Sequence, residues 1–255
     1  MKWNPGTYNN FRSERMRPFY DCVQLIELRP SMDVIDLGCG MGDLTLKLAE
    51  YLPEPKTVLG VDSSAEMLLE SSRYKHDKLS FRQGGIEDQL KDNKKWDLIF
   101  SHAAIQWIAD HRSLMSIMIS RLKPGGQLLI QMPAQYHNIT NRILVELADT
   151  KPYCDALQNW NRRSPVLDPG EYGEILFRNG GQNIQVFEKI YPVVVNDSDD
   201  LYDWVSGTTL IPYLERLNDD AAIAFVAEFK MRLKRHFSQS PVFYPFKRII
   251  MSASF

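Results

Sequence analysis

The sequence predicts an α/β fold: a mostly parallel, seven-stranded sheet with helices on both faces and a small helical cap. Short apolar runs alternate with amphipathic stretches in the first half of the 255 residues, which is typical of repeated strand–helix–strand units. A glycine-rich turn directly follows the first apolar run. Hydrophobic residues make up 44% of the chain and charged residues 24%, so the composition is that of an ordinary globular protein.

The elements of the first half follow from this alternation, which is typical of a Rossmann-like sheet. We expect strands at 34–37, 58–61, 79–82, 97–101 and 127–131. We expect helices at 13–28, 43–51, 65–72 and 114–122, each with apolar residues three or four positions apart. The run Lys123-Pro124-Gly125-Gly126 predicts the end of the last helix and a turn before the fifth strand.

The pattern changes after Pro133. Residues 137–180 contain several prolines and a glycine pair, which favours irregular helices. Two further strands are expected at 183–191 and 248–253, with helices near 199–207 and 219–237 between them. Helical insertions after the fifth strand indicate a core that carries a small cap.

Charge, cysteines and hydropathy argue against several classes of protein. The net charge of −2 gives no general attraction to nucleic acid or to an anionic membrane. Three scattered cysteines without a CxxC pair predict neither a disulfide framework nor a metal site. The polar N-terminal segment is unlike a signal peptide, and no apolar run approaches the ~18 residues of a membrane span. We therefore expect a cytoplasmic protein with no metal, no nucleic-acid partner and no membrane segment.

The glycine-rich turn has the setting of a nucleotide-binding loop. Gly38, Gly40 and Gly42 lie between a strand and a helix, where glycines permit a tight turn and a close approach of the backbone to a ligand. The spacing is GxGxG, whereas dinucleotide-binding folds have GxGxxG. Asp36 precedes the first glycine by two residues, and a carboxylate there repels a pyrophosphate but attracts ammonium and sulfonium groups. S-adenosylmethionine carries both groups.

Asp62 is the second acidic candidate. It ends the second expected strand, twenty residues after Gly42, where an acidic residue binds the ribose hydroxyls in this architecture. The alternative is that Asp62 or Ser63 only caps the following helix. Together the glycines and two carboxylates predict a nucleoside-containing ligand.

These residues resemble the class I methyltransferases, through the run from Asp36 to Gly42 and the run from Gly60 to Met67. The likeness extends to the trans-aconitate 2-methyltransferases through the segments at 3–18, 97–111, 131–133 and 203–205. It covers nearly the whole chain. The resemblance implies an enzyme that uses S-adenosylmethionine and releases S-adenosylhomocysteine.

The family implies a role for each matching position. Asp36, Gly38, Gly40 and Ser101 would line the methionine and ribose portions, and Asp62 would hold the ribose hydroxyls. The adenine would be contacted by the remaining matched residues: Ser63, Met67, Ile86 and Glu87. Related sequences tend to have an acidic residue at the edge of the adenine, where this chain reads Gly84-Gly85-Ile86-Glu87. Glu87 is the candidate to replace that carboxylate. The likeness also implies one domain over 1–255, with an N-terminal lid helix at 1–30, a cofactor-binding core at 31–133, and cap elements at 134–182 and 197–240.

Methyl transfer to a carboxylate needs alignment and exclusion of water but no general base, because the acceptor is already ionised at neutral pH. Arginine is the preferred partner of such an anion. Arg15 matches the family's N-terminal segment, and Gln106 and Trp107 follow the fourth strand, where ligands bind in such sheets. We expect these three residues to position the substrate, a small-molecule carboxylate.

The identity of the substrate stays open. Ile211 stands where the bacterial trans-aconitate enzymes commonly have arginine, which favours a less charged acid, such as those methylated by the similar juvenile-hormone acid methyltransferases. Alternatives are an acid carried on an acyl carrier protein, a nitrogen or carbon nucleophile, and a cofactor-binding protein without turnover. The GxGxG spacing and Asp36 disfavour a nicotinamide oxidoreductase. A monomer or weak homodimer is expected.

Overall fold

The computed structural model describes residues 12–255, without the side chains of 12–15 and of Thr208. The chain divides into two compact units. The larger, which we call the sheet unit, comprises residues 18–133, 165–189 and 248–255. The smaller, which we call the helical unit, comprises the described residues 12–17, 134–164 and 190–247.

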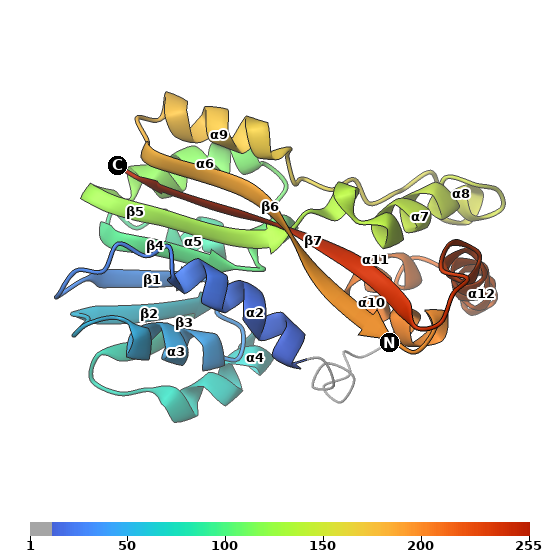
Figure 1. The fold of residues 1–255 in the computed structure, drawn as a ribbon, viewed down its shortest axis with the longest axis horizontal. Helices are drawn as coiled ribbons and strands as arrows, with labels where there is room; N and C mark the ends of the chain where they lie inside the picture. The colour runs from blue at the N-terminus through green and yellow to red at the C-terminus, as the bar shows by residue number, and fades with distance from the viewer. Residues whose placement is uncertain (1–11) are drawn as a thin grey trace. The chain divides into compact units, whose positions relative to one another are not determined.

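Seven strands form one sheet in the order β3-β2-β1-β4-β5-β7-β6 (Figure 1). The strands are β1 (Asp33–Leu37), β2 (Thr57–Asp62), β3 (Leu79–Gln83), β4 (Trp96–His102), β5 (Leu122–Pro133), β6 (Gln182–Val195) and β7 (Val242–Ser254). The pairs among β1 to β5 are parallel, whereas β7 runs antiparallel to β5. The predicted fold class is confirmed, and the late strands are longer than expected.

The strand β1 explains why this sheet forms where it does. All five of its residues are buried, including Asp33 and Asp36. Strands β2 and β4 pair with its two edges, and in a parallel sheet the helices that connect the strands cover both faces. The helices around the sheet unit are α2 (Arg12–Val23), α3 (Asp43–Tyr51), α4 (Ala65–Ser71), α5 (Ile86–Gln89), α6 (His111–Ser120) and α9 (Pro169–Arg178).

The junction of α6 and β5 differs from the prediction. The helix was expected at 114–122, but it begins at His111, where the Asp110 side chain accepts a hydrogen bond from the Ser113 backbone. It ends at Ser120, and β5 already begins at Leu122, so the expected turn lies within the first residues of the strand. The strand begins there because Leu122 already pairs with Trp96 of β4. The neighbouring Lys123 ammonium lies 2.7 Å from the carboxylates of both Asp33 and Asp97.

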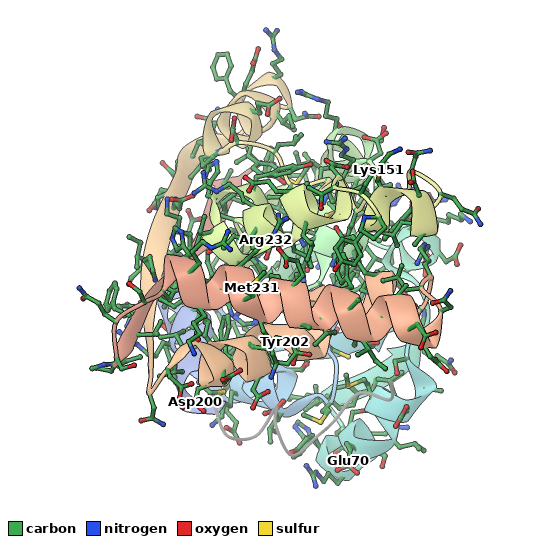
Figure 2. The ribbon with its side chains drawn as sticks, turned by 90° about the vertical axis from the view of Figure 1, so that its right-hand side faces the viewer. Glu70, Lys151, Asp200, Tyr202, Met231 and Arg232 are labelled. Atoms are coloured by element: carbon green, nitrogen blue, oxygen red, sulfur yellow. The ribbon has the colours of Figure 1, made fainter. Side chains whose placement is uncertain are left out.

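The helical unit has its own hydrophobic core. Its elements include η3 (Gln135–His137), α7 (Ile139–Ala148), α8 (Tyr153–Ala156), α10 (Ser198–Thr209), α11 (Ile211–Leu214) and α12 (Asp219–His236). Phe225, Phe229 and Leu233 are fully buried on α12, and Figure 2 shows α12 along the front of this unit with α10 beside it. The irregular helices expected at 137–180 include two regular ten-residue helices, α7 and α9.

Candidate cofactor site

The loop after β1 turns sharply at three glycines. Gly38, Gly40 and Gly42 have φ angles of 83°, 55° and 80°, which side chains other than glycine adopt at a cost. A Cβ atom on Gly38 would lie 2.0 Å from the Cβ of Ala104. A Cβ atom on Gly40 would meet no heavy atom of the described chain within 4 Å. Gly38 is therefore required by packing, whereas the backbone of Gly40 faces open space that a ligand can enter.

Asp36 lies in β1, directly before this loop, with one unpartnered carboxylate oxygen. The residue is 2% exposed, and its Oδ2 accepts a hydrogen bond of 2.6 Å from the Thr45 hydroxyl. The Oδ1 atom is buried and has no partner among the described residues. Burial raises the pKa of Asp36 to about 7, and the charge of Asp62 adds to the shift. A cationic ligand would satisfy this oxygen and favour its ionised form.

Asp62 joins the glycine loop to the start of α4. Its Oδ2 accepts a 2.8 Å hydrogen bond from the Gly40 backbone, and its Oδ1 accepts one of 2.8 Å from the Ser64 backbone. The cap of α4 is Ser64, whose hydroxyl accepts from the Met67 backbone at 3.2 Å. Asp62 is therefore not the helix cap, and each of its oxygens retains a lone pair for a ligand hydroxyl.

The four residues expected at the adenine differ in exposure. Ile86 is buried, and its Cδ1 lies 3.9 Å from the Cβ position of Gly38. Met67 is half-buried in the first turn of α4, whereas Ser63 and Glu87 are exposed. Glu87 belongs to the first turn of the short helix α5. The structure thus brings Ile86 next to the glycine loop, while the roles of the other three stay predictions.

Ser101 forms a hydrogen bond with the residue that precedes the glycine loop. The residue is fully buried, and its hydroxyl donates a 2.7 Å hydrogen bond to the carbonyl of Leu37, directly before Gly38. Its proton is therefore committed to the end of β1. A contact between its oxygen and the methionine portion stays a prediction.

Gln106 and Trp107 lie in the turn η2 (Ile105–Trp107) after β4. The Gln106 amide donates a 2.7 Å hydrogen bond to the Ala103 carbonyl, and its Oε1 is buried without a partner among the described residues. Trp107 is 54% exposed. An unsatisfied buried acceptor such as Gln106 Oε1 is unusual in a purely structural turn. Arg15, the third substrate candidate, lies outside the residues whose side chains are described.

A buried hydrogen-bond chain that the sequence did not reveal holds this turn. His111 Nε2 lies 2.9 Å from the Ile105 carbonyl, which can only accept, so this nitrogen carries the proton. His111 Nδ1 then accepts from the Tyr172 hydroxyl, which itself accepts from the Leu167 backbone at 3.1 Å. Burial lowers the pKa of His111, consistent with the neutral ring. The residues His111 and Tyr172 are 61 positions apart, and no spacing in the sequence connects them.

Two expected absences can be compared with the structure. In the described part of the chain, no three His, Cys, Asp or Glu side chains cluster as metal ligands would. Among the described helices, none is both long and apolar enough to cross a bilayer.

Comparison with known proteins places the chain in a family. The family model described as "Methyltransferase domain" matches residues 28–180. The trans-aconitate 2-methyltransferase of Deinococcus radiodurans is 37% identical over 260 residues, which cover all of this chain and 98% of that protein. The enzyme of the same name from Variovorax paradoxus is 33% identical over 91% of this chain and 89% of its own length.

Solved structures show the same fold at lower identity. The YcgJ protein of Bacillus subtilis has a TM-score of 0.59 and 18% identity, over 95% of this chain and 98% of that one. Phosphoethanolamine N-methyltransferase 2 of Haemonchus contortus, solved with S-adenosylmethionine, has a TM-score of 0.56 and 18% identity, over 93% of this chain and 52% of that one. As its sequence motifs predicted, the chain belongs to the methyltransferase domain family, as an S-adenosylmethionine-dependent enzyme that resembles the trans-aconitate 2-methyltransferases.

Proposed function

We propose that this enzyme methylates a carboxylate oxygen of a small-molecule acid, either trans-aconitate or a less charged acid. The observation that carries the proposal is the unsatisfied buried oxygen of Asp36, because it fits a cationic methyl donor, and the open space at the backbone of Gly40 in the following loop leaves room for that donor. The names of the relatives support the acceptor, since several are trans-aconitate 2-methyltransferases.

The residues of the loop fit S-adenosylmethionine. Asp36 would face its positive charge, Gly38 and Gly40 would leave room for its methionine and ribose portions, and Asp62 would accept hydrogen bonds from the ribose hydroxyls. Ser101 would lie at the methionine portion, with the adenine contacted by Ser63, Met67, Ile86 and Glu87. When bound, this cofactor supplies an electrophilic methyl group whose transfer to a carboxylate makes an ester, leaves a neutral thioether and moves no proton.

The chain's own contribution to the reaction is alignment and exclusion of water. Arg15 would hold the substrate carboxylate through two parallel N–H donors. The Gln106 oxygen would accept from a neutral donor on the acid, and Trp107 would cover the reacting groups. Ile211, at the start of α11, is apolar where the resemblance to the trans-aconitate enzymes implies an arginine, and this favours an acid with fewer charges.

A tritiated-methyl assay over a panel of acids tests this function. The panel runs from cis- and trans-aconitate through dicarboxylates to fatty acids, with an amine and a phenol as acceptors of other classes. We expect base-labile methyl ester from at least one acid, and Asp36→Asn should abolish it. Methylation of only the amine or phenol would overturn carboxyl transfer, and absence of all product with measurable cofactor binding would indicate a binding protein without turnover.

Two broader expectations belong to the same proposal. We place the enzyme in the cytoplasm, as a monomer or weak homodimer that acts on a free small molecule. Sedimentation at micromolar concentration measures the assembly directly, and a stable tetramer would contradict it.

A further inference from the structure

Two polar side chains at the carboxyl ends of β4 and β5 contain buried nitrogens without hydrogen-bond partners. Gln131 of β5 is fully buried, and its Nε2 atom has no partner among the described residues. His102, the last residue of β4, is half-buried, and its Nε2 atom is buried and also has no partner in the described fold. Buried polar groups in folded proteins are nearly always paired. The two nitrogens therefore require an explanation other than packing.

These two residues, which we call the His102–Gln131 pair, lie side by side on one face of the sheet. They are register partners in the parallel pairing of β4 with β5, so their side chains leave neighbouring strands on the same face. The ring of Phe19 in α2 packs edge-on against His102, with ring centroids 6.1 Å apart. His102 directly follows Ser101, at the carboxyl edge of the sheet, where ligands bind in this architecture. The pair is therefore placed where a substrate can reach it.

A contact with Arg248 of β7 fixes the orientation of the Gln131 amide. The Arg248 guanidinium donates a 3.3 Å hydrogen bond to Gln131 Oε1, and both residues are buried. A guanidinium can only donate, so the amide atom that faces it is the oxygen. The unpartnered atom of Gln131 is therefore its N–H donor, which requires an acceptor that the described part of the fold does not supply.

The positive charge of Arg248 acts on the surroundings of the pair. Burial lowers the pKa of His102 to about 3, and the charge of Arg248 adds to the shift. Burial and the charge of Asp21 raise the pKa of the Cys22 thiol in α2, and Arg248 opposes that shift. The His102 ring is therefore neutral at pH 7 and carries one N–H, which a ligand can draw to Nε2. The pair thus offers two donors beside a cation.

Gln127 shows what a structural glutamine does on the same face of the same strand. It lies four residues before Gln131 in β5 and is 2% exposed. Its Nε2 donates to the Leu25 carbonyl and to the Ser252 hydroxyl, and its Oε1 accepts from the Glu27 backbone. Both polar atoms of Gln127 have partners within the fold. Packing on this face therefore does not by itself leave an amide unpaired, and the free donor of Gln131 points to a ligand.

We propose that His102 and Gln131 bind a second carboxylate of the acid substrate, beside the positive charge of Arg248, and that the protein prefers diacids to monoacids. A carboxylate accepts from both N–H groups at once, and such charge-assisted bonds are stronger in a buried setting. A diacid also carries fewer charges than trans-aconitate, which agrees with the apolar Ile211. That the bound diacid is the methyl acceptor rests on the proposed function, whereas the binding of the diacid does not.

Equilibrium binding to the full-length protein saturated with S-adenosylhomocysteine tests this preference. The probes are diacids and monoacids of equal length: succinate with butanoate, glutarate with pentanoate, and adipate with hexanoate. We expect at least one diacid to bind tenfold or more tighter than its monoacid. The monoamide of that diacid has the same shape with one charge fewer, and it should bind as weakly as the monoacid.

Two substitutions change the donors and keep the shape. His102→Phe keeps a ring against Phe19 but removes Nε2, and it should raise the Kd of the preferred diacid at least threefold without lowering the unfolding midpoint, because that nitrogen has no partner in the fold. Gln131→Glu keeps an acceptor for Arg248 and replaces the free donor by a negative charge. It should raise the diacid Kd at least tenfold and the monoacid Kd less than twofold. The control is Gln127→Leu, which should lower the unfolding midpoint and leave the diacid preference unchanged.

The possible outcomes separate this subsite from the proposed function. Equal binding of diacids and monoacids, or no binding of any diacid below 10 mM, would overturn the subsite. A diacid preference that His102→Phe retains would also overturn it, as would variants that weaken only the binding of S-adenosylhomocysteine. Diacid binding that depends on the pair, together with no methyl ester from any acid, would overturn the proposed function and leave the subsite standing. Ester formation with an unchanged diacid-to-monoacid ratio of kcat/KM in His102→Phe would do the reverse.

Discussion

The Oδ2 atom of Asp62 lies 2.8 Å from the backbone nitrogen of Gly40. A residue at the end of β2 therefore holds the turn after β1, and the same carboxylate remains able to accept ligand hydroxyls. Loop geometry and ribose binding thus depend on one side chain. A substitution at Asp62 therefore tests cofactor binding and loop geometry together.

Replacement of Asp62 by Asn should weaken the binding of S-adenosylhomocysteine by about 1–3 kcal/mol, since a charge-assisted acceptor is lost. Isothermal titration measures the change. The control is Asp88→Asn, because Asp88 is an exposed carboxylate that pairs with Lys91. Unchanged affinity in a folded Asp62→Asn protein would limit the residue to holding the loop.

The pH dependence of cofactor binding should report Asp36. Its pKa is raised from 3.8 to about 7 in the folded chain, so the folded state keeps a proton that the unfolded state loses. The tighter binding of this proton by the folded state stabilises the fold. Its contribution is fully present below pH 3.8 and is lost as the pH rises to about 7. Binding of S-adenosylmethionine below pH 7 should therefore release a proton, and its Kd should fall as the pH rises from 6 to 8.

Titration calorimetry in buffers of different ionisation enthalpy measures the released proton. Asp36→Asn should bind the cofactor weakly with no proton release, and its stability should vary less between pH 4 and 7. Proton uptake on binding to the wild-type chain would contradict an Asp36 that is protonated before the cofactor enters.

Two glycine substitutions should separate packing from ligand space. Gly38→Ala places a Cβ 2.0 Å from Ala104 Cβ, and we expect a loss of about 2–4 kcal/mol from overpacking and a left-handed backbone. Gly40→Ala should cost only about 1–2 kcal/mol, because the backbone strain acts alone. Its methyl group should instead occupy space needed by the cofactor. Denaturant unfolding measures the stability of both variants, and calorimetry measures their affinity for the cofactor. Equal stability of the two variants would contradict a packing role that is specific to Gly38.

Tyr172→Phe should show whether the chain through His111 supports the Gln106–Trp107 turn. The variant leaves His111 Nδ1 buried without its donor, which should destabilise the fold by about 1–3 kcal/mol. We expect a lower kcat/KM with little change in the Kd of S-adenosylhomocysteine. Tyr153→Phe is the control, because the Tyr153 hydroxyl also donates one hydrogen bond, to the Ala224 carbonyl, but in the helical unit. Loss of stability without loss of kcat/KM would assign the chain a structural role alone.

The local sequence pattern was sufficient to predict many of the helices, strands and candidate site residues of this protein. The helix at 43–51 was predicted at both ends, because a glycine turn precedes it and its apolar residues follow one face. The positions of β1 to β5 along the chain and the two carboxylates at the ends of β1 and β2 were also predicted, since parallel strands place their carboxyl ends at one edge. The order of the strands within the sheet came only from the structure. The start of β5 was missed because it depends on the pairing of Leu122 with Trp96 of β4, and the ion pairs of Lys123 join it to Asp33 and Asp97, which lie 90 and 26 residues away.

Tertiary structure decided what the sequence could only name as candidates. Asp36 is an acidic residue in the sequence, but its raised pKa and unused oxygen exist only because the fold buries it. His111 and Tyr172 form one hydrogen-bond chain, and Arg248 donates to Gln131, although neither pair is close in the sequence. A periodic pattern records the neighbours of a residue along its own helix or strand. Contacts between distant segments depend on how those elements pack, and burial, charge and partners are set there.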